Sequence, residues 1–145
     1  MKIMVEHAQV QENEVVLRCP ALDEEMLWVL SVLHSGIQRL CVWDEQRCTV
    51  LLSPGEVMYC ESVEERTYVY TSQEVYQCAL SLAELEGRYG QLGFFRAGKP
   101  TLINLHCIRT LESRPGGRIE ATVETGEKLV VSRHYAPLLR ERLGM

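Results

Sequence analysis

Residues 94 to 105, FFRAGKPTLINL, place two cations, Arg96 and Lys99, beside a glycine and a proline in a short stretch of an acidic chain. Guanidinium and ammonium groups donate hydrogen bonds and cannot accept them, so their chemistry is the binding of anionic or acceptor-rich partners. Gly98 and Pro100 indicate a connection, which is the usual place for binding residues. A strand connection whose cations are only solvated is the alternative interpretation.

Two further connections have the same character. Arg66 and Thr67 follow the turn residues Val63-Glu64-Glu65. Ser132-Arg133-His134 connects the last predicted strand to the last predicted helix. Threonine and histidine can both donate and accept hydrogen bonds. The sequence therefore predicts three connections with binding side chains.

A catalytic site would need a nucleophile, a base or a set of metal ligands. His106 and Cys107 are neighbours in the sequence, and neighbouring side chains of a strand point to opposite faces, so they cannot form a dyad with each other. The histidines at positions 7, 34 and 134 do not form a ligand pair at helical spacing. We expect no enzyme activity, no catalytic or metal-binding residue and no cofactor.

The charge of the chain is unevenly distributed. The formal net charge is -5, which at first sight argues against a polyanionic partner. Residues 1 to 87 hold 5 of the 15 Lys and Arg and 15 of the 20 Asp and Glu, so they sum to -10, whereas residues 88 to 145 sum to +5. One face is thus expected to attract anions and another to repel them, unless the charges are solvated without a partner.

The 145 residues fit one domain with one sizeable core. No stretch approaches the roughly 20 apolar residues that span a bilayer, so we expect a cytoplasmic protein. The six cysteines form no Cys-x-x-Cys pair, and we expect them to be small buried hydrophobes in a reducing compartment. The chain is too short to add a receiver domain, so phosphorelay control within it is not expected.

Alternation of apolar and polar residues with period two dominates the chain and predicts short strands. These predicted strands are residues 14–19, 40–43, 48–52, 56–61, 67–71, 108–111, 118–123 and 128–131. Helices are few: Asp23 is a predicted N-cap of a helix that ends at Gly36, Ser81 and Glu84 match a capping box, and a third helix covers about residues 135–143.

The predicted fold class is mainly β (α+β) with short helices. The N-terminal part, residues 1–50, is expected to be a β-α-β-β extension that packs on the main domain, residues 51–145.

Three segments follow one another in a specific order: GEVMYCESVEERTYVYT, SLAELEGRYGQLGFFRAGKPTLINLHCIRTL and GEKLVVSRHYAPLLRERL. Their order and spacing resemble the LytTR family of bacterial DNA-binding domains over about residues 50 to 143. The resemblance includes Phe-Phe-Arg at residues 94–96, Asn104 after an apolar pair, and Val-Ser-Arg-x-Tyr at residues 131–135. The N-terminal segment is similar to the extension of stand-alone members that lack a receiver domain.

The resemblance implies an elongated, mostly antiparallel β-sheet domain that lies along duplex DNA and bends it. Loops at 64–67, 96–101 and 132–134 would enter two successive major grooves. The residues that the resemblance places at DNA contacts are Arg66, Thr67, Arg96, Lys99, Thr101, Arg133 and His134, with Lys99 at the base-contacting position of a long loop. Candidate phosphate contacts are Arg88, Arg109, Arg114 and Arg118.

The chain departs from this family at two places. Gly98-Lys99-Pro100 stands where members commonly have His-Arg-Ser or His-Lys-Ser, which removes a histidine and a hydroxyl and stiffens the backbone. Glu64 and Glu65 put negative charge beside a predicted contact, so binding is expected to be weaker or tuned to a different site.

Several residues of the resemblance have structural alternatives. Arg96 fits an internal salt bridge as well as a phosphate contact. Phe94 and Phe95 alternate in direction, so at least one is expected in the core, and Asn104 is expected to satisfy backbone groups at a strand end.

Taken together, the sequence predicts a transcriptional regulator that binds double-stranded DNA, as a homodimer on repeated half-sites, and no small-molecule substrate. The alternative hypothesis is a protein-interaction module of the same fold with weakened DNA contacts, controlled by a membrane protein or another regulatory partner.

Overall fold

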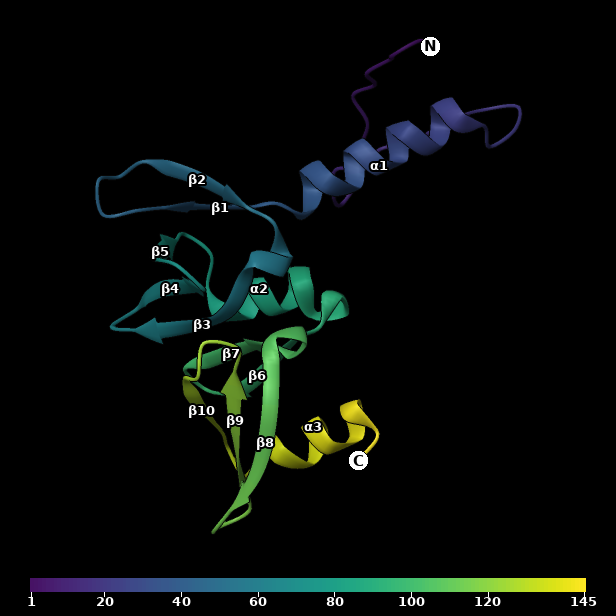
Figure 1. Ribbon diagram of the computed structural model, residues 1–145. Coiled ribbons are helices and arrows are strands. Elements are labelled where there is room, and N and C mark those ends of the chain that lie inside the picture. Colours follow the sequence, from purple (N-terminus) through teal and green to yellow (C-terminus); the bar gives the residue numbers. More distant parts are fainter.

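The computed structural model describes residues 1–145, without the side chains of residues 35–38. Most of the chain forms antiparallel strands (Figure 1). In chain order the helices and strands are α1 (Glu24–Gln38), β1 (Leu40–Trp43), β2 (Thr49–Leu52), β3 (Val57–Val63), β4 (Arg66–Thr71), β5 (Val75–Cys78), α2 (Leu82–Tyr89), β6 (Phe94–Gly98), β7 (Thr101–Asn104), β8 (Ile108–Arg114), β9 (Arg118–Val123), β10 (Lys128–Val131) and α3 (Ala136–Leu143).

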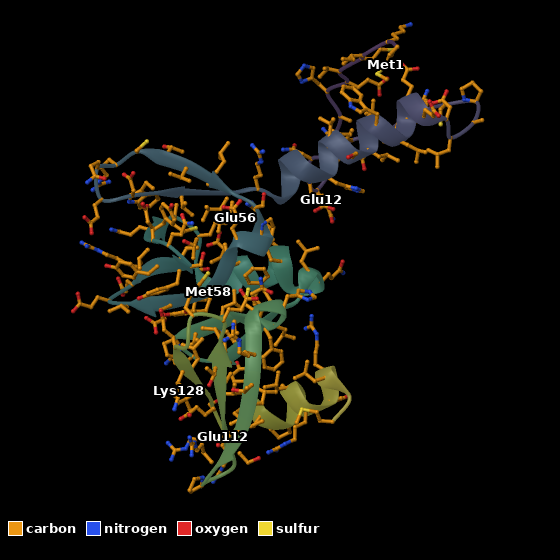
Figure 2. The ribbon with its side chains drawn as sticks, viewed as in Figure 1. Met1, Glu12, Glu56, Met58, Glu112 and Lys128 are labelled. Atoms are coloured by element: carbon orange, nitrogen blue, oxygen red, sulfur yellow. The ribbon has the colours of Figure 1, made fainter. Side chains whose placement is uncertain are left out.

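The strands form two sheets, a larger one in the order β2-β1-β5-β4-β3-β7-β6 and a smaller one in the order β10-β9-β8. Figure 1 shows the larger sheet in the middle of an elongated molecule, the smaller sheet and α3 at one end, and α1 projecting at the other. Figure 2 labels Met1 at the α1 end and Glu112 and Lys128 at the opposite end. The expected mainly β, antiparallel fold is confirmed.

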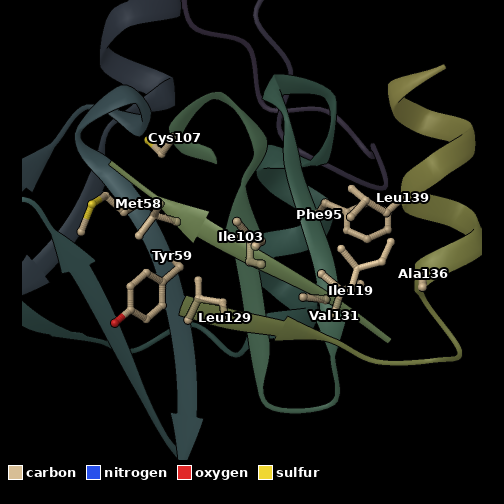
Figure 3. Packing of buried hydrophobic residues seen from close by; sticks show 13 residues of the cluster. Met58, Tyr59, Phe95, Ile103, Cys107, Ile119, Leu129, Val131, Ala136 and Leu139 are labelled. Carbon is tan, nitrogen blue, oxygen red and sulfur yellow. The ribbon is translucent and has the colours of Figure 1, made fainter. Parts of the chain in front are cut away.

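Apolar residues of the larger sheet pack into two hydrophobic cores, one on each face, because successive side chains of a strand point to opposite faces. One core joins that sheet to the smaller sheet and α3, and Figure 3 shows Phe95 and Ile103 packing towards Ile119, Val131 and Leu139. The other core lies on the opposite face under α2. Its members include Val42, Val69, Leu85, Phe94 and Leu102. Phe94 and Phe95 thus enter different cores, so both are core residues.

Two helices begin at the residues that the capping patterns predict. The Asp23 side chain accepts a hydrogen bond from the Met26 amide at 3.0 Å, and the Ser81 hydroxyl accepts one from the Glu84 amide at 3.1 Å. Such caps satisfy amides that have no partner within the helix. The predicted end of the first helix at Gly36 is wrong, since α1 continues to Gln38. A glycine inside a helix costs only about 1 kcal/mol, which is too little to end it.

The predicted strand at residues 14–19 is wrong, and the N-terminal segment has the order α-β-β. Val15 and Val16 are 66% and 68% exposed. Alternation alone does not make a strand, because a strand needs a hydrogen-bonding neighbour. The division into residues 1–50 and 51–145 stays a prediction, and the boundary lies inside β2, whose partner β1 joins the larger sheet at the pair Trp43 and Gln77.

Two parts of the larger sheet were not predicted. The first is β5, which pairs antiparallel with β4. The second is a hairpin of Phe94–Gly98 and Thr101–Asn104, which replaces the expected long loop. The β6 strand is hard to recognise because the pairing shifts register between Arg96 and Gly98, which interrupts the period-two pattern. Only Lys99 and Pro100 remain as the connection.

The cysteines divide into two groups. Cys60, Cys78 and Cys107 are buried as expected, whereas Cys19, Cys41 and Cys48 are exposed, and all six are free thiols. Burial raises the pKa of the Cys60, Cys78 and Cys107 thiols, which keeps these thiols protonated. Within the described part of the chain, no helix has the length and apolarity to cross a membrane.

Candidate nucleic-acid interface

The β6–β7 turn is held from both sides by backbone hydrogen bonds. The Ser62 amide of β3 donates to the Pro100 carbonyl at 2.9 Å. The Ser132 amide, at the end of β10, donates to the Ala97 carbonyl at 2.8 Å. The turn that carries Lys99 therefore lies between the strand that leads to residues 64–67 and the connection at 132–134. The fold brings the three predicted connections together.

Arg96 faces inward. Its Nε donates to the Gly98 carbonyl at 2.8 Å, and Nη2 donates to the Lys99 carbonyl at 2.6 Å. Nη1 lies 3.7 Å from a carboxylate oxygen of Glu86 on α2, and the Arg96 side chain is 18% exposed. Of the two interpretations of this arginine, the geometry matches the internal one.

Lys99 is exposed at the tip of the β6–β7 turn, with no hydrogen bond or ion pair of its side chain among the described residues. The carbonyls of residues 97 to 100 each accept a hydrogen bond, from Ser132, Arg96 (two) and Ser62. The backbone under Lys99 is therefore fixed while its ammonium group remains free. Thr101 is half-buried opposite Glu61 of β3.

The β3–β4 turn consists of Glu64 and Glu65, with Arg66 exposed at the start of β4. Thr67 is only 7% exposed, between Ser62 and Cys78 on the neighbouring strands. A side chain so covered presents little surface to a partner. Of the two predicted residues, Arg66 is the accessible one.

A hollow of about 650 Å³ lies beside Arg66. Trp43 and Arg47 from the β1–β2 hairpin and Glu65 contribute to its walls. Sequence reasoning did not find Arg47, because its proximity to Arg66 depends on the pairing of β1 with β5 across more than 30 residues of chain.

The turn at Glu64 and Glu65 is strained, because both residues have positive φ, 50° and 65°. A two-residue hairpin turn of this type favours Asn-Gly. Replacing the pair as Glu64→Asn with Glu65→Gly is expected to raise the free energy of unfolding by about 1 to 2 kcal/mol, measured by urea denaturation. The control Glu64→Gln with Glu65→Gln removes the charges and keeps the strain, so an equal gain in both variants would contradict the backbone explanation.

Arg133 and His134 are exposed on the connection between β10 and α3. The Arg133 stem packs over Gly117 of the β8–β9 turn, where an added Cβ would lie 2.9 Å from Arg133 Cγ. The His134 ring meets Tyr135 edge to face, with centroids 4.9 Å apart, and Tyr135 in turn meets Phe95 of the core. The backbone of this connection is held at both ends, because the Ser132 amide donates to the Ala97 carbonyl and the Ser132 carbonyl accepts from the Tyr135 and Ala136 amides.

The predicted phosphate contacts differ in their surroundings. Arg114 hydrogen-bonds Glu120 at 2.8 Å and Glu112 at 3.0 Å. The bond to Glu120 raises the pKa of Arg114, and the same bond lowers the pKa of Glu120. Arg114 is thus engaged by carboxylates. Arg118 is exposed, and among the described side chains its one hydrogen bond is to the Pro115 carbonyl, at 3.3 Å.

Arg88 and Arg109 are also exposed, on α2 and β8. Within the described side chains, no hydrogen bond or ion pair joins either of them to residues 64–67, 96–101 or 132–134. The assignment of Arg88 and Arg109 as phosphate contacts therefore stays a prediction.

Cations on fixed connections at one edge of an elongated β fold define a candidate polyanion-binding domain. The chain belongs to the LytTR family: the family described as the LytTr DNA-binding domain matches residues 47–144. This match covers the larger sheet from β2 onwards, the smaller sheet and α3.

Known proteins with similar sequences or folds agree with this assignment. An uncharacterized response regulatory protein of Vibrio cholerae is 32% identical over 106 residues, which are 70% of this chain and 44% of the relative. The sensory transduction protein LytT of Enterococcus faecalis is 26% identical over 96 residues, 66% of this chain and 39% of the relative. The chain thus spans less than half the length of these curated relatives.

A solved structure supports the fold. The LytTr DNA-binding domain of a Bacillus cereus protein superposes with a TM-score of 0.70 at 22% identity, over 74% of this chain and 98% of that one.

Proposed function

We propose that this protein is a cytoplasmic transcriptional regulator that binds duplex DNA sequence-specifically through one edge of its LytTR domain. The observation that carries the proposal is the convergence of three connections, with Arg66, Lys99 and Arg133 exposed on fixed backbone. Phosphate attraction alone needs only positive charge, whereas base readout needs donors at fixed positions. The four hydrogen-bonded carbonyls of residues 97 to 100 support base readout, because they fix the position of the Lys99 backbone.

In the proposed complex, Lys99 donates to base acceptors in a major groove. Guanine presents O6 and N7 there, and a well-placed contact discriminates by about 1 to 3 kcal/mol. Arg133 and His134 read the adjacent groove, and Arg66 completes the edge beside the β3–β4 turn. Arg118 contacts phosphate and sets the register of the complex without reading sequence.

Glu64 and Glu65 oppose this binding. Their carboxylates lie at the tip of the β3–β4 turn next to Arg66 and repel phosphates within a Debye length of about 8 Å at physiological salt. We infer that they lower the affinity for all DNA and thereby limit occupancy of unrelated sites.

A protein-interaction role is the second candidate, and α1 favours it. Leu27, Trp28 and Val32 are 52%, 66% and 50% exposed on this helix, and a helix with apolar residues all round is normally covered. We propose that the N-terminal part meets a protein partner, either a regulatory or membrane protein or a second copy on repeated half-sites. DNA binding and such a contact are compatible, since α1 projects away from the β3–β4 turn (Figure 1).

Salt dependence tests the DNA-binding proposal. The intact chain is used to select duplexes from a random-sequence pool, and affinity for a selected duplex is measured by fluorescence anisotropy between about 50 and 200 mM salt. We expect log Kd to rise with log salt by about 0.9 per phosphate neutralised, with several phosphates involved. Failure to enrich any sequence, together with no binding at about 50 mM salt, would contradict the proposal.

A further inference from the structure

Arg96 occupies a different place from the exposed cations of the site. Its Nε and Nη2 atoms donate to two consecutive carbonyls, those of Gly98 and Lys99, at 2.8 and 2.6 Å. Its side chain is 18% exposed, so the guanidinium lies folded against the turn. Two of its nitrogens are already used by the backbone that carries Lys99.

We infer that Arg96 is a positioning residue that sets the sequence specificity of Lys99 without contacting DNA itself. The inference rests on the proposed function and deepens it. Ser132 and Ser62 fix the two ends of the turn through the carbonyls of Ala97 and Pro100. Arg96 fixes the two carbonyls between them, which determine the direction in which the Lys99 side chain leaves the backbone.

The chemistry explains why an arginine serves here. The planar guanidinium has donors in a fixed fork and can hold two acceptors at once, whereas the lysine ammonium is a point charge on a flexible stem. A lysine at position 96 keeps the charge and loses the simultaneous hold on both carbonyls. A phosphate contact would need only the charge, so the two roles predict different behaviour for Arg96→Lys.

Glu86 has a smaller part in this arrangement. Its carboxylate lies 3.7 Å from Arg96 Nη1 and its side chain is 45% exposed. Exposed ion pairs at this distance contribute little, because water and salt screen them. Glu86→Gln therefore serves as a matched control that changes a neighbour of Arg96 while leaving the two carbonyl bonds in place.

The test compares a duplex selected by the intact chain with an unselected duplex of equal length. Arg96→Lys and Arg96→Gln are expected to lose about tenfold in affinity for the selected duplex, which is the low end of what one misplaced base contact costs. Affinity for the unselected duplex should change by about twofold or less for Arg96→Lys, and the slope of log Kd against log salt should stay unchanged in both variants. A slope reduced by about 0.9 in Arg96→Gln would show a direct phosphate contact and overturn the inference.

A double-mutant cycle with Lys99 gives an independent readout. If Arg96 acts through Lys99, Arg96→Gln should cost about twofold or less on the selected duplex once Lys99 is alanine, because coupled residues are not additive. Full tenfold additivity would contradict the inference. Glu86→Gln should bind as the intact chain does, and thermal melting checks that each variant is folded; if Arg96→Gln is not, Arg96→Lys carries the test.

The outcomes separate this inference from the proposed function. If the intact chain enriches no duplex, both fail. If it enriches one and the Arg96 variants bind that duplex with unchanged affinity, only the positioning role fails.

Discussion

Lys99→Ala is expected to weaken binding to a selected duplex by about 1 to 3 kcal/mol, and to weaken binding to unselected DNA much less. The physical reason is that Lys99 is exposed on a turn whose carbonyls are all hydrogen-bonded, so its ammonium group can meet base acceptors at a fixed position. Fluorescence anisotropy on both duplexes at one salt concentration measures the difference.

Arg118→Ala is the matched control for Lys99→Ala. Arg118 is exposed at the start of β9 and is proposed to contact phosphate only. Loss of the Arg118 side chain should weaken binding to both duplexes alike, and the slope of log Kd against log salt should fall by about 0.9. If Lys99→Ala also weakens binding to both duplexes equally, Lys99 attracts phosphate and does not read sequence.

Asn104→Ala is expected to lower the free energy of unfolding by about 2 to 3 kcal/mol, which is the second large effect. The Asn104 amide nitrogen donates to the buried Val57 carbonyl at 2.9 Å, and its oxygen accepts from the His106 amide at 3.1 Å. Asn104 is 2% exposed, so water does not replace these partners readily. Urea denaturation measures the loss.

The exposed residue Thr110 on β8 provides the control for Asn104. Thr110→Ala should change stability by about 0.5 kcal/mol or less. If the Asn104 variant behaves like the Thr110 variant, the buried hydrogen bonds do not stabilise the end of β7.

The parts of the fold that local patterns determine could be predicted from the sequence. β9 and β10 were predicted with their observed bounds, because alternation and turn residues are properties of consecutive residues. The N-cap at Ser81 could also be predicted, because its hydrogen-bond partner Glu84 lies only three residues away. The role of Asn104 at a strand end is also confirmed, although its partner Val57 lies 47 residues away and was not predictable.

The parts that depend on distant contacts were missed or misread. The strand expected at residues 14–19 has the right pattern and no neighbour to pair with. The β6–β7 hairpin is interrupted by a register shift. The bonds that hold its turn come from Ser62 of β3 and from Ser132, which follows β10. Arg96 could not be assigned from residue type, because the same guanidinium suits a carbonyl pair or a phosphate.

The placement of the three predicted connections at one edge is the central claim, and a matched charge reversal tests it most directly. One variant combines Arg66→Glu, Lys99→Glu and Arg133→Glu at that edge. Its control combines Lys2→Glu, Arg18→Glu and Arg39→Glu, which are exposed in the N-terminal part and change the net charge equally. Both are measured by anisotropy on a selected duplex at about 0.15 M salt, where charges more than about 8 Å apart are largely screened.

We predict that the edge variant loses more than about 100-fold in affinity, since three contacts become repulsive, while the control stays within about threefold of the intact chain. Equal losses in the two variants would show that net charge, and not this edge, determines binding, and would contradict the account.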